Sequence, residues 1–182
     1  MKVKNWQLAL AAGIGVTAIA LTLNSCGTIP KGTVAVKPFD REKYLGKWYE
    51  IARLDFRFEK GLSNVTATYS IRDNGLINVD NKGFDDKKGI WKESVGQAKF
   101  AGATDEAKLK VSFFGPFYAP YNVIAIDENY QYALVAGKNL DYLWILSKTP
   151  TILPAIRTDF LKQAQSLGYD VHKLVWTKHD RP

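Results

Sequence analysis

The sequence predicts an all-β protein: an eight-stranded antiparallel up-and-down barrel, followed by one C-terminal helix and a ninth strand. Two observations predict the barrel. Strand-like runs alternate with turn signals from Trp48 to Lys148, at spacings of about 8 to 12 residues. The clearest of these runs are apolar on one face only, so the sheet must stack or close. Short hairpins between successive strands favour closure into a barrel.

The first 25 residues have the features of a secretory signal peptide, which is removed from a mature protein. Lys2 and Lys4 precede a run of 18 uncharged residues from Trp6 to Leu23. The alternative is an uncleaved transmembrane helix, since this run approaches the roughly 20 residues that span a bilayer. The following Leu23-Asn24-Ser25-Cys26 resembles the lipobox of bacterial lipoproteins, although Asn24 is unusual at its position. We therefore expect cleavage before Cys26.

Cys26 is the only cysteine, so no intramolecular disulfide can form in an exported chain. The resemblance to lipoproteins implies that Cys26 carries several acyl chains, and stable anchoring needs more than one. It also implies sorting to the outer membrane, because Gly27 and not aspartate follows the cysteine. The expected location is therefore the periplasmic face of a bacterial outer membrane.

Residues 26–38 are expected to form the lipidated N-terminus and a tether, because glycine, proline, lysine and threonine recur there in loose order. Residues 39–182 are expected to form one folded domain. Loss of Lys2 and Lys4 with the signal lowers the net charge from +7 to +5. The basic residues are scattered, which argues against a nucleic-acid partner but favours some attraction to anionic lipid headgroups.

Turn signals divide the barrel into its strands. Asp73-Asn74-Gly75 is the clearest, since Asn and Gly tolerate the positive φ of a type I′ turn, and it should pair Val65–Arg72 with Leu76–Phe84. Further breaks are expected at Asp85–Gly89, Gly102–Glu106, Gly115-Pro116, Asp127–Asn129 and Lys138–Asp141.

The spacing of apolar residues changes after Thr149-Pro150. Ile156, Phe160, Ala164 and Leu167 recur at helical steps, and Gly168 is placed to end the helix. The run Val171–Thr177 then predicts a strand with Leu174 and Trp176 on one face, which adds to the edge of the barrel.

Three motifs along this series of strands resemble those of a known protein family. Gly46-Lys47-Trp48 resembles the G-x-W motif at the first strand of the lipocalins. The stretches 129–135 and 143–150 resemble the second and third conserved regions, in the expected order. The stretch 112–118 is similar to bacterial outer-membrane lipocalins, which are relatives of apolipoprotein D. The resemblance implies a calyx that holds a small apolar ligand.

One position departs from the family pattern. The third lipocalin region usually supplies an arginine that lies across the tryptophan of G-x-W, and here the matching residue is Lys148. Lysine lacks the flat guanidinium but can still make a cation–π contact with Trp48. We interpret Gly46, Trp48 and Lys148 as structural residues at the closed end.

The sequence offers few parts for catalysis. His172 and His179 are the only histidines and show no metal-ligand spacing. The acidic pairs Asp85-Asp86 and Asp127-Glu128 are expected in solvated turns. We therefore expect no enzyme activity, metal or cofactor. An isomerase or hydrolase that uses the calyx, and a haem carrier that uses a tyrosine ligand, remain alternatives.

The ligand-binding hypothesis depends on the aromatic content, with 5 Trp, 9 Tyr and 9 Phe. Strand alternation predicts Val111 and Phe113 as lining residues, the resemblance implies Trp144 and Leu146, and Tyr132 and Leu134 are expected neighbours. Phe56, Phe58, Phe117 and Tyr118 flank the expected loops, where aromatic side chains can gate the mouth or touch a membrane. The basic candidates for a headgroup anchor are Arg53, Arg57, Lys60 and Lys99, and the sequence does not choose among them.

The sequence thus predicts a non-enzymatic carrier or store of fatty acids, lysophospholipids or similar lipids, with a role in envelope maintenance under stress. The main alternative is an interaction protein whose barrel is fully packed. Whether the protein forms a homodimer stays open at this point.

Overall fold

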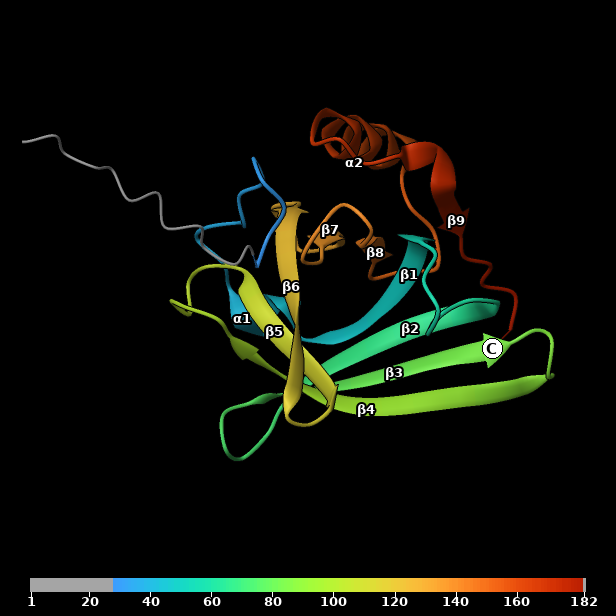
Figure 1. Ribbon diagram of the computed structural model, residues 1–182, viewed down its shortest axis with the longest axis horizontal. Coiled ribbons are helices and arrows are strands. Elements are labelled where there is room, and N and C mark those ends of the chain that lie inside the picture. Colours follow the sequence, from blue (N-terminus) through green and yellow to red (C-terminus); the bar gives the residue numbers. More distant parts are fainter. Residues whose placement is uncertain (1–27, 182) are drawn as a thin grey trace, which may run out of the picture.

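Nine strands follow one another in residues 28–181, which are the residues that the computed structural model describes (Figure 1). The strands are β1 (Gly46–Leu54), β2 (Leu62–Ile71), β3 (Ile77–Asp85), β4 (Ile90–Phe100), β5 (Lys108–Phe114), β6 (Phe117–Ile126), β7 (Tyr132–Ala136), β8 (Leu143–Ser147) and β9 (Leu174–Trp176). The helices are α1 (Arg41–Tyr44), α2 (Pro154–Ser166) and a 3₁₀ turn, η1 (Val171–Lys173). The expected signal peptide and Cys26 lie outside the described residues.

The first eight strands close into an antiparallel barrel, which confirms the predicted fold. Each strand from β2 to β7 pairs with the next one along the chain, β8 pairs with β1, and β1 returns to β2 with Gly46 opposite Tyr69. The ninth strand, β9, pairs antiparallel with β1, with Ala52 opposite Trp176. The short connections therefore join all eight strands in sequence order, as predicted for an up-and-down barrel.

The hairpin at Asp73-Asn74-Gly75 pairs β2 with β3 as predicted, but its turn type differs. Gly75 has a φ of +78°, whereas Asn74 does not have the positive φ that a type I′ turn requires. The Asn74 side chain instead accepts a hydrogen bond from the Leu76 N–H, at 3.1 Å. The loop thus has three residues with glycine in the left-handed position, a common hairpin geometry.

Two apolar layers follow from the alternation of side chains along the strands. The inner layer fills the barrel and includes Trp48, Tyr69, Val111 and Leu146. The outer layer lies between the wall and α2, which covers β7 and β8 in Figure 1, and it contains Phe160 and Ala164 of the helix. The predicted helical face is confirmed, and Gly168, with a φ of +94°, follows the helix end.

The predicted last strand is shorter than expected. Val171–Lys173 form the 3₁₀ turn η1, in which the Asp170 side chain accepts from the His172 N–H, so β9 begins at Leu174. Leu174 is buried, whereas Trp176 is partly exposed beneath the guanidinium of Arg157, 3.9 Å from the ring centroid.

The stretch expected to be a tether contacts the barrel. The Thr28 carbonyl accepts from Asn122 Nδ2 at 2.8 Å. Val36 donates to the Val123 carbonyl and accepts from the Ala107 N–H, both at 2.9 Å. Residues 28–38 therefore lie along the wall from β6 toward α1, a short helix that the sequence analysis missed and that Asp40 caps.

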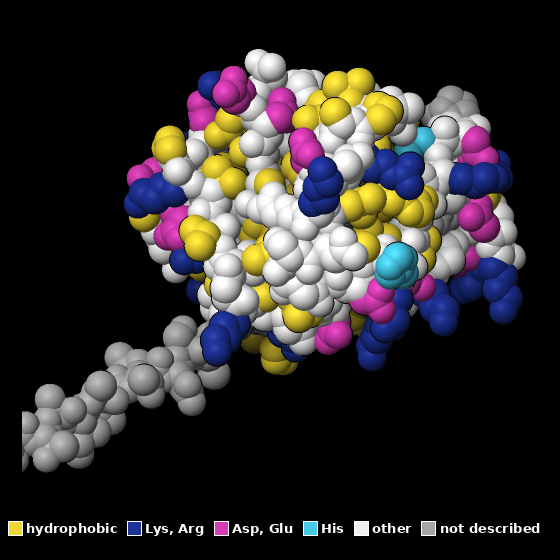
Figure 2. Space-filling view, turned by 90° about the horizontal axis from the view of Figure 1, so that it is seen from above, with side chains coloured by type: hydrophobic (Ala, Val, Ile, Leu, Met, Phe, Trp, Pro, Cys, Tyr) yellow, Lys and Arg dark blue, Asp and Glu magenta, His cyan; other side chains and the backbone are white. Residues whose placement is uncertain are grey.

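On the face of the molecule that carries α2, charged side chains of both signs are interspersed among apolar ones (Figure 2). No helix within residues 28–181 is long and apolar enough to cross a membrane.

Candidate ligand-binding site

Trp48 closes one end of the barrel, here called the closed end. Its ring is fully buried and its Nε1–H donates to the Tyr44 carbonyl at 2.7 Å. Lys148 Nζ lies 4.3 Å from the centroid of the Trp48 ring and donates to the Leu45 carbonyl at 2.5 Å. Burial lowers the pKa of Lys148 to about 8. The expected cation–π contact is therefore present, together with a hydrogen bond to the turn after α1.

Gly46 completes this closed end. Its φ is +92°, a conformation that side chains rarely adopt, and an added Cβ would lie 3.6 Å from Lys148 Nζ. Glycine therefore lets β1 begin beneath the lysine.

A cluster of three tyrosines lies above Trp48 in the barrel interior. The Tyr121 hydroxyl is 2.6 Å from that of Tyr44 and 2.8 Å from that of Tyr69. Desolvation by burial raises the pKa of all three well above its ordinary value, so they stay neutral phenols. Two hydrogen bonds use two of the three O–H donors. One O–H donor is therefore left for another acceptor.

The opposite end, called the mouth, is formed by loops 55–61, 86–89, 115–116 and 137–142. Ser94 and Ala119 face inward near this end, as the pairing of Val111 with Ala119 and of Asn81 with Ser94 requires. Both are nevertheless exposed. The interior is thus reached by solvent from the mouth, while inward side chains near Trp48 are buried.

Four predicted lining residues belong to the inner layer. Val111 and Leu146 are buried, while Phe113 and Trp144 are partly exposed. Phe113 lies against Gly96, where an added Cβ would approach its ring to 2.7 Å.

The other two predicted lining residues, Tyr132 and Leu134, lie on the outer face of β7 and pack with the α2 layer. Their inward neighbours are Ala133 and Val135. The expectation that Tyr132 and Leu134 line the calyx is wrong because successive side chains of a strand alternate between faces, and the sequence left the parity of this all-apolar strand ambiguous.

Arg53 is the centre of a buried charged network near the mouth. Its guanidinium donates to the Glu50 carboxylate at 2.6 Å and to the Glu59 carbonyl at 2.7 Å. It also reaches Asp55 at 3.3 Å. Arg53, one of the four basic candidates for a headgroup anchor, is therefore already bonded to other groups of the protein.

Glu59 joins this network to a predicted lining residue. Trp144 Nε1 donates to Glu59 Oε2 at 3.1 Å. Burial, and next the negative charge of Glu50, raise the pKa of Glu59 to about 8. At neutral pH the carboxyl is thus largely protonated and offers a neutral hydrogen-bonding group beside the Trp144 ring.

The sequence analysis missed this network for a specific reason. Strict alternation would place Glu50 and Arg53 on opposite faces of β1. The register shifts between Glu50 and Ala52, which turns both side chains inward. Nothing in the local sequence marks this bulge. The tyrosine cluster was also missed, since its members come from α1, β2 and β6.

The C-terminal segment fills the place where β1 and β2 separate. Direct pairing of β1 with β2 ends at Tyr49 opposite Thr66. Beyond it, the Thr177 N–H donates to the Ile51 carbonyl and the Asn64 N–H donates to the Lys178 carbonyl. The Thr177 hydroxyl also donates to the Glu50 carboxylate at 2.6 Å, so this segment contacts the buried network directly.

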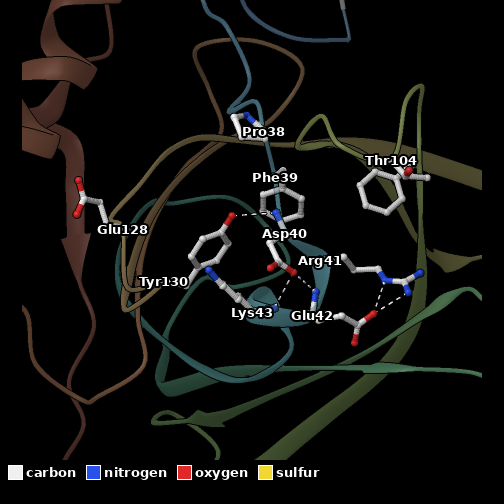
Figure 3. Close-up of a pocket in the computed structure, with 10 residues that line it drawn as sticks. Pro38, Phe39, Asp40, Arg41, Glu42, Lys43, Thr104, Glu128 and Tyr130 are labelled. Carbon is white, nitrogen blue, oxygen red and sulfur yellow. Dashed lines mark hydrogen bonds and ion pairs between the residues drawn. The ribbon is translucent and has the colours of Figure 1, made fainter.

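A further hollow of about 740 Å³ lies outside the barrel, between α1 and the closed-end loops (Figure 3). Its lining includes Asp40, Arg41, Glu42, Lys43 and Glu128. These charges and the bond from the Asp40 N–H to the Tyr130 hydroxyl, 2.8 Å, make it a poor match for an apolar ligand. A smaller hollow of about 210 Å³ lies over the C-terminal segment near Trp176.

Within residues 28–181 no group of three His, Cys, Asp or Glu side chains is arranged to hold a metal ion. His179 instead contacts the Glu50 carbonyl, with 2.8 Å between Nε2 and the oxygen.

The chain belongs to the lipocalin family, since residues 39–179 match the model of the lipocalin-like domain. It is 54% identical over 154 residues to the outer membrane lipoprotein Blc of Escherichia coli K12, covering 85% of this chain and 87% of that protein. Identity to the Blc protein of Vibrio cholerae is 46% over 160 residues, covering 87% of this chain and 94% of that one. These relatives confirm the predicted location at the outer membrane.

More distant similarity extends to animal proteins. Mouse apolipoprotein D is 37% identical over 180 residues, covering 93% of this chain and 92% of its own. Insecticyanin from the tobacco hornworm Manduca sexta superposes with a TM-score of 0.67 at 22% identity, covering 84% of this chain and 86% of that chain. The latter supports the fold alone.

Proposed function

We propose that this protein is a non-enzymatic lipocalin that binds fatty acids, lysophospholipids or similar lipids in its barrel and stores or carries them at the outer membrane. A role in envelope maintenance under stress goes with this proposal, and so does lipidation of Cys26 after removal of residues 1–25. No cofactor, metal or nucleic acid takes part.

The observation that carries the proposal is the unequal filling of the barrel. Bulky buried side chains, with Trp48 and the tyrosine cluster, fill the closed half. The mouth half combines small inward residues with Phe113 and Trp144, and two of the small ones, Ser94 and Ala119, are exposed to solvent. Such an interior suits an acyl chain, whose burial contributes about 0.8 kcal/mol per CH₂.

The polar groups suggest how a lipid would lie. The protonated Glu59 and the Trp144 indole are at the mouth, where a headgroup would remain near water. Because Arg53 is already bonded to Glu50, a free carboxylate would find no unpaired guanidinium there. A lipid whose head stays solvated outside the mouth therefore fits better than one with a buried charge.

Titration of residues 28–182 with lipids of increasing chain length, followed by tryptophan emission, tests the proposal. This fragment retains the hydrogen bonds of Thr28 and Val36 to the wall. We expect saturable quenching that Trp144→Phe reduces strongly. Ala119→Phe, which fills the mouth half, should weaken binding at least tenfold.

Thr68→Phe is the matched control, because Thr68 faces outward beside the inward Ala67 and Tyr69. It should leave the affinity unchanged. If a folded parent protein shows no saturable signal with any lipid, the barrel is packed and the interaction-protein alternative replaces this one.

A further inference from the structure

The exposed large apolar side chains of the hairpin loops gather at the mouth. We call Phe58, Ile90, Phe114, Phe117 and Leu140 the mouth rim; their exposed fractions run from 41% to 77%. They come from four different loops or loop edges, yet the up-and-down topology brings all four loops to one end. Exposed aromatic residues at a single end of a soluble domain mark an interaction site.

The charges of the same loops are unbalanced. In loops 55–61, 86–89 and 137–142 the exposed basic residues are Arg57, Lys60, Lys87, Lys88 and Lys138, and the exposed acidic residues are Asp55, Asp86 and Asp141. Glu59 is partly buried and its pKa is raised. The mouth is thus apolar with an excess of positive charge.

The loops at the closed end have a different balance of charge. Loops 72–76, 101–107 and 127–131 carry Asp73, Asp105, Glu106, Asp127 and Glu128, with Arg72 as the single basic residue. Asp105 and Glu106 pair with Lys37 and Lys108. This end therefore has no positive excess in its loops.

The N-terminal segment reaches the barrel near the mouth. Asn122 Nδ2, which donates to the Thr28 carbonyl, also donates to the carbonyl of Ala136, the last residue of β7 before loop 137–142. From Thr28 the chain leads to Val36 and then to Phe39, whose N–H donates to the main-chain carbonyl of Asp105 at the closed end. Cys26 is two residues before Thr28 in the sequence.

We propose that the mouth rim docks on the surface of an anionic phospholipid bilayer, with the barrel opening toward the lipid. The apolar rim enters the interface, and the basic residues around it contact lipid phosphates. Arg57, whose guanidinium lies 4.4 Å from the Phe58 ring centroid, can keep its charge at the headgroups while Phe58 inserts.

This docking rests on the proposed function and deepens it. An anchor at Cys26 keeps the protein at the membrane but does not by itself orient the barrel. The rim supplies an orientation in which an acyl chain passes between bilayer and barrel without crossing bulk water.

The test uses the lipidated full-length product, purified from membranes and reconstituted into vesicles of phosphatidylethanolamine and phosphatidylglycerol. Phe117→Cys carries a nitroxide label at the rim, and Leu153→Cys carries it beyond the closed end, where Leu153 is 57% exposed. The parent chain, with Cys26 alone, checks that this thiol is blocked.

We expect the label at position 117 to be several-fold more accessible to oxygen than to a water-soluble nickel complex, and the label at 153 to show the reverse. Lys60→Glu combined with Lys87→Glu should move the label at 117 toward water, as should vesicles of phosphatidylcholine alone. Lys47→Glu with Lys162→Glu, also exposed, is the matched charge control and should change nothing.

Two water-accessible labels on anchored protein would overturn the docking proposal. Lipid binding by residues 28–182 is measured separately. If the fragment binds lipid but the rim does not dock, the docking proposal is wrong and the proposed function stands. If the rim docks but the fragment binds no lipid, the lipid-carrier function is wrong and the membrane-docking surface remains.

Discussion

At the scale of single residues, the buried Arg53 and the partly buried Lys148 are both held by hydrogen bonds. Lys148 donates to the Leu45 carbonyl above the Trp48 ring, and Arg53 is bonded to Glu50 and to main-chain carbonyls. An isolated buried charge would destabilise the fold, and the hydrogen-bond partners of both side chains offset that cost. The two following predictions concern Lys148 and Glu59.

Lys148→Met should lower the free energy of unfolding by about 1 to 3 kcal/mol, because it leaves the Leu45 carbonyl without its donor. Lys148→Arg retains a cation and donors, and it should cost clearly less. Urea denaturation at pH 7 measures both. Equal losses for the two variants would mean that neither the hydrogen bond nor the cation matters.

Glu59→Gln should alter how stability depends on pH. The pKa of Glu59 rises from 4.5 in the unfolded chain to about 8 in the fold. The folded state therefore holds this proton between those values, and stability is present below pH 4.5 and lost as pH rises through 8. Gln remains neutral and still accepts from Trp144. Relative to the parent, the variant should gain about 3 kcal/mol in the free energy of unfolding as pH rises from 5 to 8.

Denaturation midpoints at several pH values check this, with Lys60→Gln as an exposed neighbouring control. Parallel pH curves for parent and Glu59→Gln would show that Glu59 ionises normally in the folded protein.

At the scale of elements, the five residues of β7 contribute to two different apolar layers. Leu134 packs outward against the α2 layer, while Val135 packs inward. Both are fully buried, so burial alone does not distinguish ligand lining from helix docking. Successive side chains alternate between the two faces of a strand, so the face of one residue fixes the faces of the others and distinguishes the two roles.

Leu134→Ala should therefore destabilise the protein by about 2 to 5 kcal/mol, as large-to-small changes in a core do, and leave lipid affinity within twofold. Thermal unfolding and the lipid titration measure the two effects. A matching loss of affinity in folded Leu134→Ala protein would mean that the outer layer shapes the calyx.

At the scale of the whole molecule, the topology collects at one end what the sequence distributes over four loops. The mouth rim and its basic residues are separated by up to 83 positions between Arg57 and Leu140. The eight hairpin-linked strands make them neighbours.

Membrane attachment is tested at this scale. Cys26→Ser should move most of the protein from the membrane to the soluble fraction, because docking of the rim alone is weaker than anchoring by several acyl chains. Fractionation at low and at 0.5 M salt measures this. A variant that stays membrane-bound in high salt would contradict the lipid anchor.

The sequence by itself determined the barrel, its helix and the closed-end motif, since these follow from local turn chemistry, from side-chain periodicity and from the resemblance around Trp48. Strand alternation also placed Val111 and Phe113 on the inner face, and the family resemblance placed Trp144 and Leu146 there. These features depend on neighbours along the chain, which a sequence shows directly.

Only the tertiary structure decided the rest. The bulge that turns Glu50 and Arg53 inward, the outward parity of Leu134 and the meeting of Tyr44, Tyr69 and Tyr121 depend on register and closure. A shift of one residue along a strand moves every side chain to the other face, and no local signal fixes either the bulge in β1 or the parity of the all-apolar β7. The site was therefore decided by long-range pairing, because its members meet only when the barrel closes.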